Sequence, residues 1–244
     1  TNMCQTPLIF LLAVTLFSCG GNNSKSSNEL IGQLQLKTGQ LISCGPPDKE
    51  FGKVDFDISC DEAVKNDFNT AMALLHSFEY DEAEKMFAKV IDSSSGCAMA
   101  YWGVAMSNFH PLWDPPSADE LKKGNQAVEI ARSIKDKTKR ESDYIEAIAK
   151  FYENADKLDH RSRVLNFEKA MESIYKTYPD DKEAIVFYAL ALNAAADPRD
   201  KTYANQRKAY GLLNQIFEKE PLHPGIAHYI IHNYDNPELA NLPL

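Results

Sequence analysis

A hydrophobic side chain recurs about every 3.6 residues from Asp61 onward, which is the spacing of one helix face. The first amphipathic segment places Phe68, Met72 and Leu75 on that face. A second segment begins near Tyr80, and its apolar face consists of Ala83, Phe87 and Val90. The pattern predicts two helices packed side by side, with the small Ala83 allowing a close approach.

The same alternation of amphipathic segments and breaks continues to the end of the chain. We expect further helices at Ala98 to Phe109, 117–134, 138–154, 160–177, 181–195, 200–218 and 224–234. A proline-rich insertion at 110–116 separates two of them. One helix pair cannot bury its apolar stripes alone, so the sequence predicts an all-α solenoid of stacked antiparallel hairpins over residues 61–244.

Residues 29–60 lack the helical period. Glycine and proline interrupt this segment, and a short run at 53–58 alternates apolar and polar positions. We therefore expect an extended N-terminal lead-in to the helices.

The first residues resemble a bacterial lipoprotein signal. Leu8 to Phe17 is an apolar run too short to cross a bilayer, and Cys19 follows it within Leu-Phe-Ser-Cys-Gly. The resemblance implies a signal peptide at 1–18, acylation of Cys19 and a flexible tether at 19–28. Gly20 after Cys19 resembles outer-membrane sorting, so we expect an outer-membrane lipoprotein that faces the periplasm or the surface and contacts the membrane only through its lipid.

The charge balance argues against nucleic acid as a partner. The chain has 26 Lys and Arg against 35 Asp and Glu, a net charge of −9. Such a field does not attract phosphate backbones without a local basic patch, and the basic residues are too sparse to form one.

Cysteine pairing follows from the expected export. Cys44, Cys60 and Cys97 remain after processing, and an exported protein permits disulfides. Cys60 and Cys97 precede two predicted helices in equivalent places of adjacent repeats, so this is the favoured pair. A Cys44 to Cys60 bond and three free thiols are the alternatives.

Several motifs resemble tetratricopeptide (TPR) repeats, helix hairpins of about 34 residues. The resemblance is carried by Phe78-x-Tyr80-x-x-Ala83-x-x-x-Phe87 and Tyr178-Pro-Asp-Asp-x-Glu-Ala184-x-x-x-Tyr188, and it spans about 61 to 240. Further motifs resemble exported bacterial TPR proteins of unassigned activity: Leu74-Leu-His-Ser-Phe78, Cys97-Ala-Met-Ala-Tyr-Trp-Gly103, Pro111-Leu-Trp113 and His223-Pro-Gly-x-x-His-Tyr-Ile-Ile-His232. That group has cysteine at both Cys60 and Cys97 and usually continues with more repeats, which implies a chain truncated at its C-terminus.

Two histidines form a candidate metal site. His228 and His232 are four residues apart on a predicted helix, so their Cβ atoms lie roughly 5–6 Å apart on one stripe, which Asp235 extends. Two imidazoles and a carboxylate can hold zinc or another divalent ion. His223 could join only from a bent lead-in. The alternative is that these histidines line the groove or bond to the preceding repeat.

A row of polar side chains is expected at the ends of the first helix of each pair. Stacking places these ends along one edge of the concave groove, and Trp113 from the insertion can contact the same ligand. The row consists of His76, Asn108, His110, Asn193 and His232.

These observations favour an envelope TPR protein that binds a protein or peptide through its concave face. No catalytic residue is predicted, because Gly-rich phosphate loops, nucleophile elbows and His-Glu-x-x-His are missing from the sequence. The alternative is a metal-dependent binder or hydrolase that uses the His-x-x-x-His site.

Overall fold

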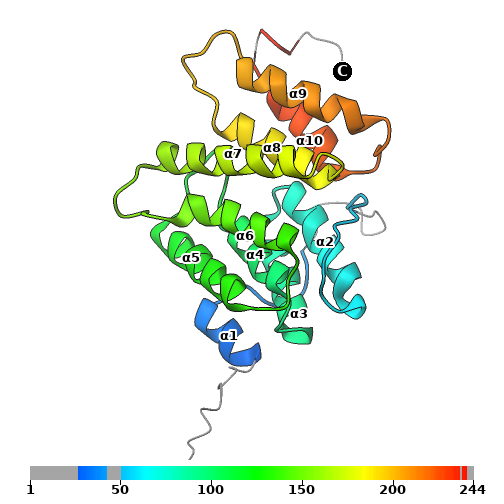
Figure 1. The fold of residues 1–244 in the computed structure, drawn as a ribbon, viewed down its shortest axis with the longest axis vertical. Coiled ribbons are helices and arrows are strands. Elements are labelled where there is room, and N and C mark those ends of the chain that lie inside the picture. Colours follow the sequence, from blue (N-terminus) through cyan, green and yellow to red (C-terminus); the bar gives the residue numbers. More distant parts are fainter. Residues whose placement is uncertain (1–26, 43–50, 237, 241–244) are drawn as a thin grey trace, which may run out of the picture.

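The computed structural model describes residues 27–42, 51–236 and 238–240, and within these ranges the chain is helical with no β-strand (Figure 1). The elements are α1 (Ser27–Leu34), a 3-10 turn (Glu62–Val64), α2 (Lys65–His76), α3 (Tyr80–Ser93), α4 (Ala98–Ser107), α5 (Ala118–Ser133), α6 (Lys139–Tyr152), α7 (His160–Thr177), α8 (Lys182–Ala194), α9 (Ala204–Phe217) and α10 (Pro224–Asn233). The predicted all-α class is confirmed, and every helix expected from Asp61 onward is present.

Side-chain caps fix the start of four helices. Ser117 and Thr138 cap α5 and α6, and each forms a reciprocal capping box with the glutamate three residues later. Asp159 and Asp181 cap α7 and α8 by accepting hydrogen bonds from backbone amides of the first turn. These boundaries were predictable because the caps are local in sequence.

The helices pack in adjacent antiparallel pairs: α2 with α3, α4 with α5, α6 with α7, and α8 with α9. In Figure 1, α1 lies at one end of the molecule and the α9/α10 pair at the other. The stack also curves back on itself, because α10 contacts α2 as well as α8 and α9. The first helices of the pairs therefore surround a common interior.

Residues 51–60, which we call the N-terminal strap, fill part of this interior. The strap is extended, and its alternating pattern buries Val54, Phe56 and Ile58 while the intervening side chains are exposed. The Phe56 ring lies 5.4–5.7 Å from rings on α2, α4 and α6. The expected extended lead-in is thus present here, but it occupies the inner face that the sequence suggested would be free for a partner.

One segment differs from the sequence expectation. Ser27–Leu34 forms helix α1, whereas we expected a flexible tether up to residue 28 and an extended segment from residue 29. Helix α1 contacts α3 and α5, and Leu34 at its end is buried. Tertiary packing stabilises this short helix, since eight residues do not form a stable helix alone.

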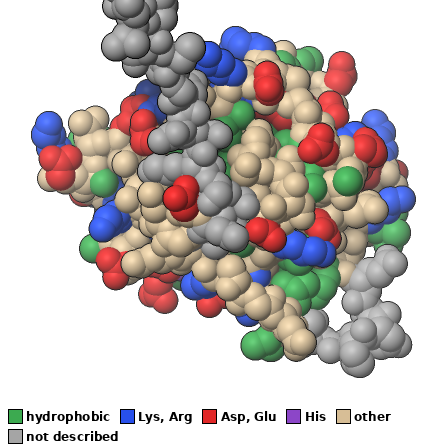
Figure 2. Space-filling view, turned by 90° about the horizontal axis from the view of Figure 1, so that it is seen from below, with side chains coloured by type: hydrophobic (Ala, Val, Ile, Leu, Met, Phe, Trp, Pro, Cys, Tyr) green, Lys and Arg blue, Asp and Glu red, His purple; other side chains and the backbone are tan. Residues whose placement is uncertain are grey.

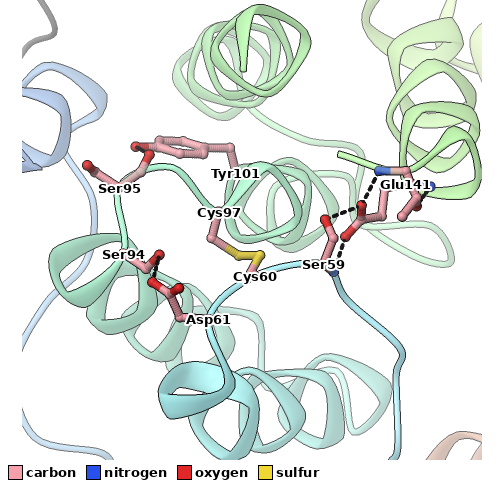
Figure 3. The surroundings of a disulfide bond; sticks show 9 residues. Ser59, Cys60, Asp61, Ser94, Ser95, Cys97, Tyr101 and Glu141 are labelled. Carbon is pink, nitrogen blue, oxygen red and sulfur yellow. Dashed lines mark hydrogen bonds between the residues drawn. A yellow bond between two sulfur atoms is a disulfide. The ribbon is translucent and has the colours of Figure 1, made fainter. Parts of the chain in front are cut away.

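The favoured disulfide is present between Cys60, at the end of the strap, and Cys97, the residue before α4 (Figure 3). The Cα atoms are 5.1 Å apart, within the usual range for a disulfide. Beside the bond, Ser94 Oγ donates to Asp61 and Ser59 donates to Glu141. Cys44 lies outside the described residues, as do the signal segment and Cys19.

The surface mixes charges of both signs. Figure 2 shows acidic and basic side chains interspersed over one face, with apolar side chains in small groups. None of the described helices has the length and apolar character needed to span a bilayer.

Gly103 of α4 sets the distance between α4 and α3. A Cβ at this position would lie 2.3 Å from the Phe87 ring. We expect Gly103→Ala to lower the free energy of unfolding by about 2 kcal/mol through overpacking. Gly211→Ala on α9, where a Cβ meets nothing within 4 Å, should instead raise it by about 0.5–1 kcal/mol. Urea denaturation of both variants checks this, and a Gly103→Ala variant as stable as Gly211→Ala would contradict it.

Candidate functional site

Three ends of helices converge on a buried polar cluster. His76 is the last residue of α2, Glu183 lies in the first turn of α8, and His223 is the residue before α10. All three side chains are at most 5% exposed. The contact of α10 with α2, together with the stacking of α8, brings these residues together from distant parts of the chain.

Glu183 links the two histidines. His76 Nε2 lies 3.0 Å from Glu183 Oε2, and His223 Nε2 lies 2.8 Å from Oε1. The Tyr229 hydroxyl lies 2.9 Å from His76 Nδ1. Because a carboxylate only accepts, both Nε2 atoms donate, and Tyr229 donates to the remaining nitrogen of His76. His223 Nδ1 is buried and has no partner among the described residues.

The electrostatics keep Glu183 ionised. Burial acts to raise the pKa of Glu183, but electrostatic interactions and hydrogen bonds with His76 and His223 outweigh it and hold that pKa well below its usual range. Burial lowers the pKa of His76, although Glu183 acts in the opposite direction. The cluster is therefore a buried carboxylate that accepts from imidazole N–H groups.

A small pocket reaches this cluster from solvent. It has a volume of about 270 Å³, and Glu183 and His223 belong to its lining. The other lining residues are charged and come from the strap, from α6, from the start of α8 and from the segment after α9: Asp55, Asp57, Arg140, Asp180, Asp181, Lys182 and Glu220.

The two histidines of α10 connect the cluster to the surface. His228 Nδ1 donates to the backbone oxygen of His76 at 2.8 Å, so its Nε2 is free to accept. His232 Nε2 lies 2.9 Å from that atom and donates to it. Burial and the neighbouring His228 lower the pKa of His232, which favours this neutral arrangement. The predicted common stripe of His228 and His232 is confirmed.

Trp113 lies on the surface next to His232, at the end of the hydrogen-bonded series His76, His228 and His232. Its side chain is 62% exposed, and its ring meets His232 edge-on at 4.8 Å and Phe78 at 5.5 Å. Beside it is a hollow of about 380 Å³ that Asn193 and His232 also line. The complete lining is Pro111, Leu112, Trp113, His160, Asn193, Ala194, His232 and Asp235.

The predicted row of binding residues is only partly assembled. Trp113, Asn193 and His232 share the hollow, with His228 directly behind His232. His76 and Asn108 are buried instead, and Asn108 donates to Glu84 and to the backbone of Val104. His110 lies elsewhere, stacked on Tyr80 at 4.7 Å and 3.5 Å from Glu120. His76 is covered by the rings of Phe187, His223 and Tyr229, and Asn108 is held against α3 by Glu84, so neither side chain faces a groove.

The predicted metal ligands are likewise not brought together as a set of three. Among the described residues, the group of three His, Cys or carboxylate ligands whose atoms lie within 4.8 Å of one another is His76, Glu183 and His223. Asp235 is exposed and does not join His228 and His232 at that distance. Glu183 and Tyr229 were not among the site residues predicted from sequence, where they appear only within the motifs that begin at Tyr178 and His223.

Comparison of the chain with protein-family models, with curated proteins and with solved structures gives no match. The functional interpretation therefore depends on the two sites described above. One is an exposed hollow beside Trp113, and the other is a buried cluster around Glu183.

Proposed function

We propose that this protein is a TPR-like scaffold that binds an extended segment of a partner polypeptide in the hollow beside Trp113. The observation that carries the proposal is the exposure of Trp113 on an aromatic support. A large ring held on one side by Phe78 and His232 loses little conformational freedom on binding. Such rings are common energetic anchors of interfaces.

The hollow has unused hydrogen-bonding groups opposite this anchor. The side chains of Asn193 and Asp235 line the hollow and form no hydrogen bond with another described residue. A peptide backbone supplies alternating hydrogen-bond donors and acceptors that can pair with these side chains. The volume of about 380 Å³ suits one or two side chains, so an extended segment with a bulky apolar residue against Trp113 is the occupant that fits.

Because the interior of the helix stack is filled, the proposed peptide-binding surface is the hollow beside Trp113 and not the inner face of the stack. Phe56 and its aromatic neighbours occupy the place where TPR-like domains offer a groove, whereas the hollow lies at the ends of α8 and α10 and on the inserted loop. In this proposal, acylation at Cys19 holds the scaffold at the bacterial envelope, at the outer membrane, and the partner is a protein that reaches the same membrane.

Replacement of Trp113 tests the proposal. Linear peptides are selected from a random display library on the wild-type protein, and their affinities are then measured for variants by fluorescence anisotropy. We expect Trp113→Ala to weaken binding roughly 30-fold, which corresponds to about 2 kcal/mol for a hot-spot tryptophan. Leu222→Ala is the matched control, because Leu222 is as exposed (66%) but lies outside the hollow.

Two results would contradict this assignment. One is a selection that yields no peptide above background. The other is a set of peptides that bind Trp113→Ala and Leu222→Ala equally well, since these would dock on a different surface.

A further inference from the structure

The buried cluster around Glu183 has a composition that structural cores seldom need. His76, Glu183 and His223 come from three helix ends separated by 107 and 40 residues in sequence, and all are removed from solvent. Burying a carboxylate and two imidazoles costs more free energy than packing apolar side chains of similar volume. Their convergence therefore calls for a reason beyond packing.

The distances place the three ligand atoms around one point. One ligating atom from each residue lies within 4.8 Å of the others, and both imidazole Nε2 atoms are within 3.0 Å of a Glu183 oxygen. Ligands of a tetrahedral zinc ion with bonds of about 2.0–2.1 Å lie roughly 3.3 Å apart. Small side-chain rotations are enough to place an ion between them.

We propose that His76 Nε2, His223 Nε2 and a Glu183 carboxylate oxygen bind a divalent transition-metal ion of the zinc class. Two imidazoles and a carboxylate favour such ions over Mg²⁺ and Ca²⁺, which prefer all-oxygen ligand sets. The pocket of about 270 Å³ that Glu183 and His223 line would give such an ion access from solvent. This inference does not depend on the peptide site at Trp113.

Besides these rotations, metal binding requires a tautomer change in each imidazole. The proton on Nε2 is replaced by the metal and a proton is taken up at Nδ1, so each ring stays neutral. In His76 the new Nδ1–H donates to the Tyr229 oxygen, which lies 2.9 Å away. The Tyr229 hydroxyl rotates so that its own proton no longer points at His76. In His223, Nδ1 has no partner among the described residues, so protonating it breaks no existing hydrogen bond. The net charge of ion and ligands becomes +1.

Groups around the cluster hold the ligands in place. Tyr229 orients His76 from α10, and the Phe187 ring lies 4.9 Å from the His76 ring. A Cβ at Gly225 would lie 2.7 Å from His76 Nδ1, so the glycine is what lets the imidazole fit against the start of α10. Partners of this kind tune metal affinity by orienting the ligating rings.

The test uses the full chain after chelator washing. Zn²⁺ is titrated in competition with a chromophoric chelator, and Co²⁺ serves as an optical probe of coordination. We expect one ion per chain, a loss of more than about 100-fold in affinity for Glu183→Gln, and a loss of about 10–100-fold for Tyr229→Phe. Circular dichroism establishes that each variant is folded.

The matched control is His232→Gln. It removes one imidazole of the other close pair of histidines, whose Nε2 atoms are 2.9 Å apart, and keeps the hydrogen bond from His228 to the His76 backbone, so it should leave Zn²⁺ affinity within a few-fold of wild type. A measurement on the wild type covers the case in which Glu183→Gln does not fold. Ring ¹⁵N resonances of His76 and His223 should shift on Zn²⁺ addition, whereas those of His110 and His160 should not.

Three outcomes would overturn the proposal. The wild-type chain could bind no stoichiometric Zn²⁺ or Co²⁺, which would make the cluster a purely structural hydrogen-bond network. Binding could be lost in His232→Gln and kept in Glu183→Gln, which would assign the ion to α10. The His76 and His223 resonances could stay unchanged while Zn²⁺ binds elsewhere.

Discussion

Replacing Cys60 and Cys97 with serine is expected to lower the free energy of unfolding by about 4 kcal/mol. The bond joins residues 37 apart in sequence, and closing a loop of that length removes this much chain entropy from the unfolded state. For a domain of this size the loss corresponds to a melting temperature roughly 8–16 °C lower. In the folded state the bond also fixes the end of the strap, whose Phe56 packs against rings of α2 and α4.

Thermal melts of the double serine variant, with and without reductant, measure this effect. Wild-type protein in reductant should melt near the temperature of the double variant, and reductant should not change the variant further. Cys44→Ser is the control, since it removes a thiol and leaves the Cys60–Cys97 bond intact. Alkylation of both Cys60 and Cys97 in denatured, unreduced wild-type protein would contradict the prediction.

The helices could be predicted from the sequence because their signals are local. The segment predicted at 160–177 forms α7 over the same residues, since Asp159 caps its first turn and the apolar period continues to Ile174. The helix expected from Asp61 begins later, at Lys65, after a 3-10 turn. Periodicity and caps thus place helices to within a few residues. Helix α1 was missed because its contacts with α3 and α5, rather than its own sequence, hold it in place.

The two sites were harder to predict from the sequence because they depend on the curvature of the helix stack. The i, i+4 spacing of His228 and His232 correctly placed their side chains together, since one helix determines that contact. The pairing of His76 with Glu183 joins residues 107 apart and requires α10 to return to α2. No local pattern encodes that return. For the same reason, a free inner groove could be expected from the sequence although the strap fills it.

Substitution of Glu141 is the second change for which we expect a large loss of folding stability, because this one buried carboxylate anchors both the strap and α6. Its side chain is 1% exposed and accepts hydrogen bonds from Ser59 N at 2.7 Å, from Ser59 Oγ at 2.6 Å and from Thr138 N at 2.6 Å. The Thr138 contact completes the capping box of α6, and the Ser59 contacts lie next to the disulfide (Figure 3). Glu141→Ala leaves three donors without their charged acceptor. We expect the free energy of unfolding to fall by about 3 kcal/mol, since hydrogen bonds to charged groups contribute about 1.5–3 kcal/mol each and part of the loss is recovered by water.

Glu120→Ala is the matched control for this prediction. Glu120 completes the same capping box at the start of α5, but its partners Ser117 N and Oγ are exposed, and its further contact, His110 at 3.5 Å, belongs to the loop just before α5. Water replaces the lost acceptor there, so we expect a loss of about 1 kcal/mol or less. Urea denaturation of the two variants measures the difference, and Ser59→Ala in the Glu141→Ala background should add little, because its hydroxyl has already lost its acceptor. Equal destabilisation by Glu120→Ala and Glu141→Ala would mean that the box alone matters and that the strap is not held by this carboxylate.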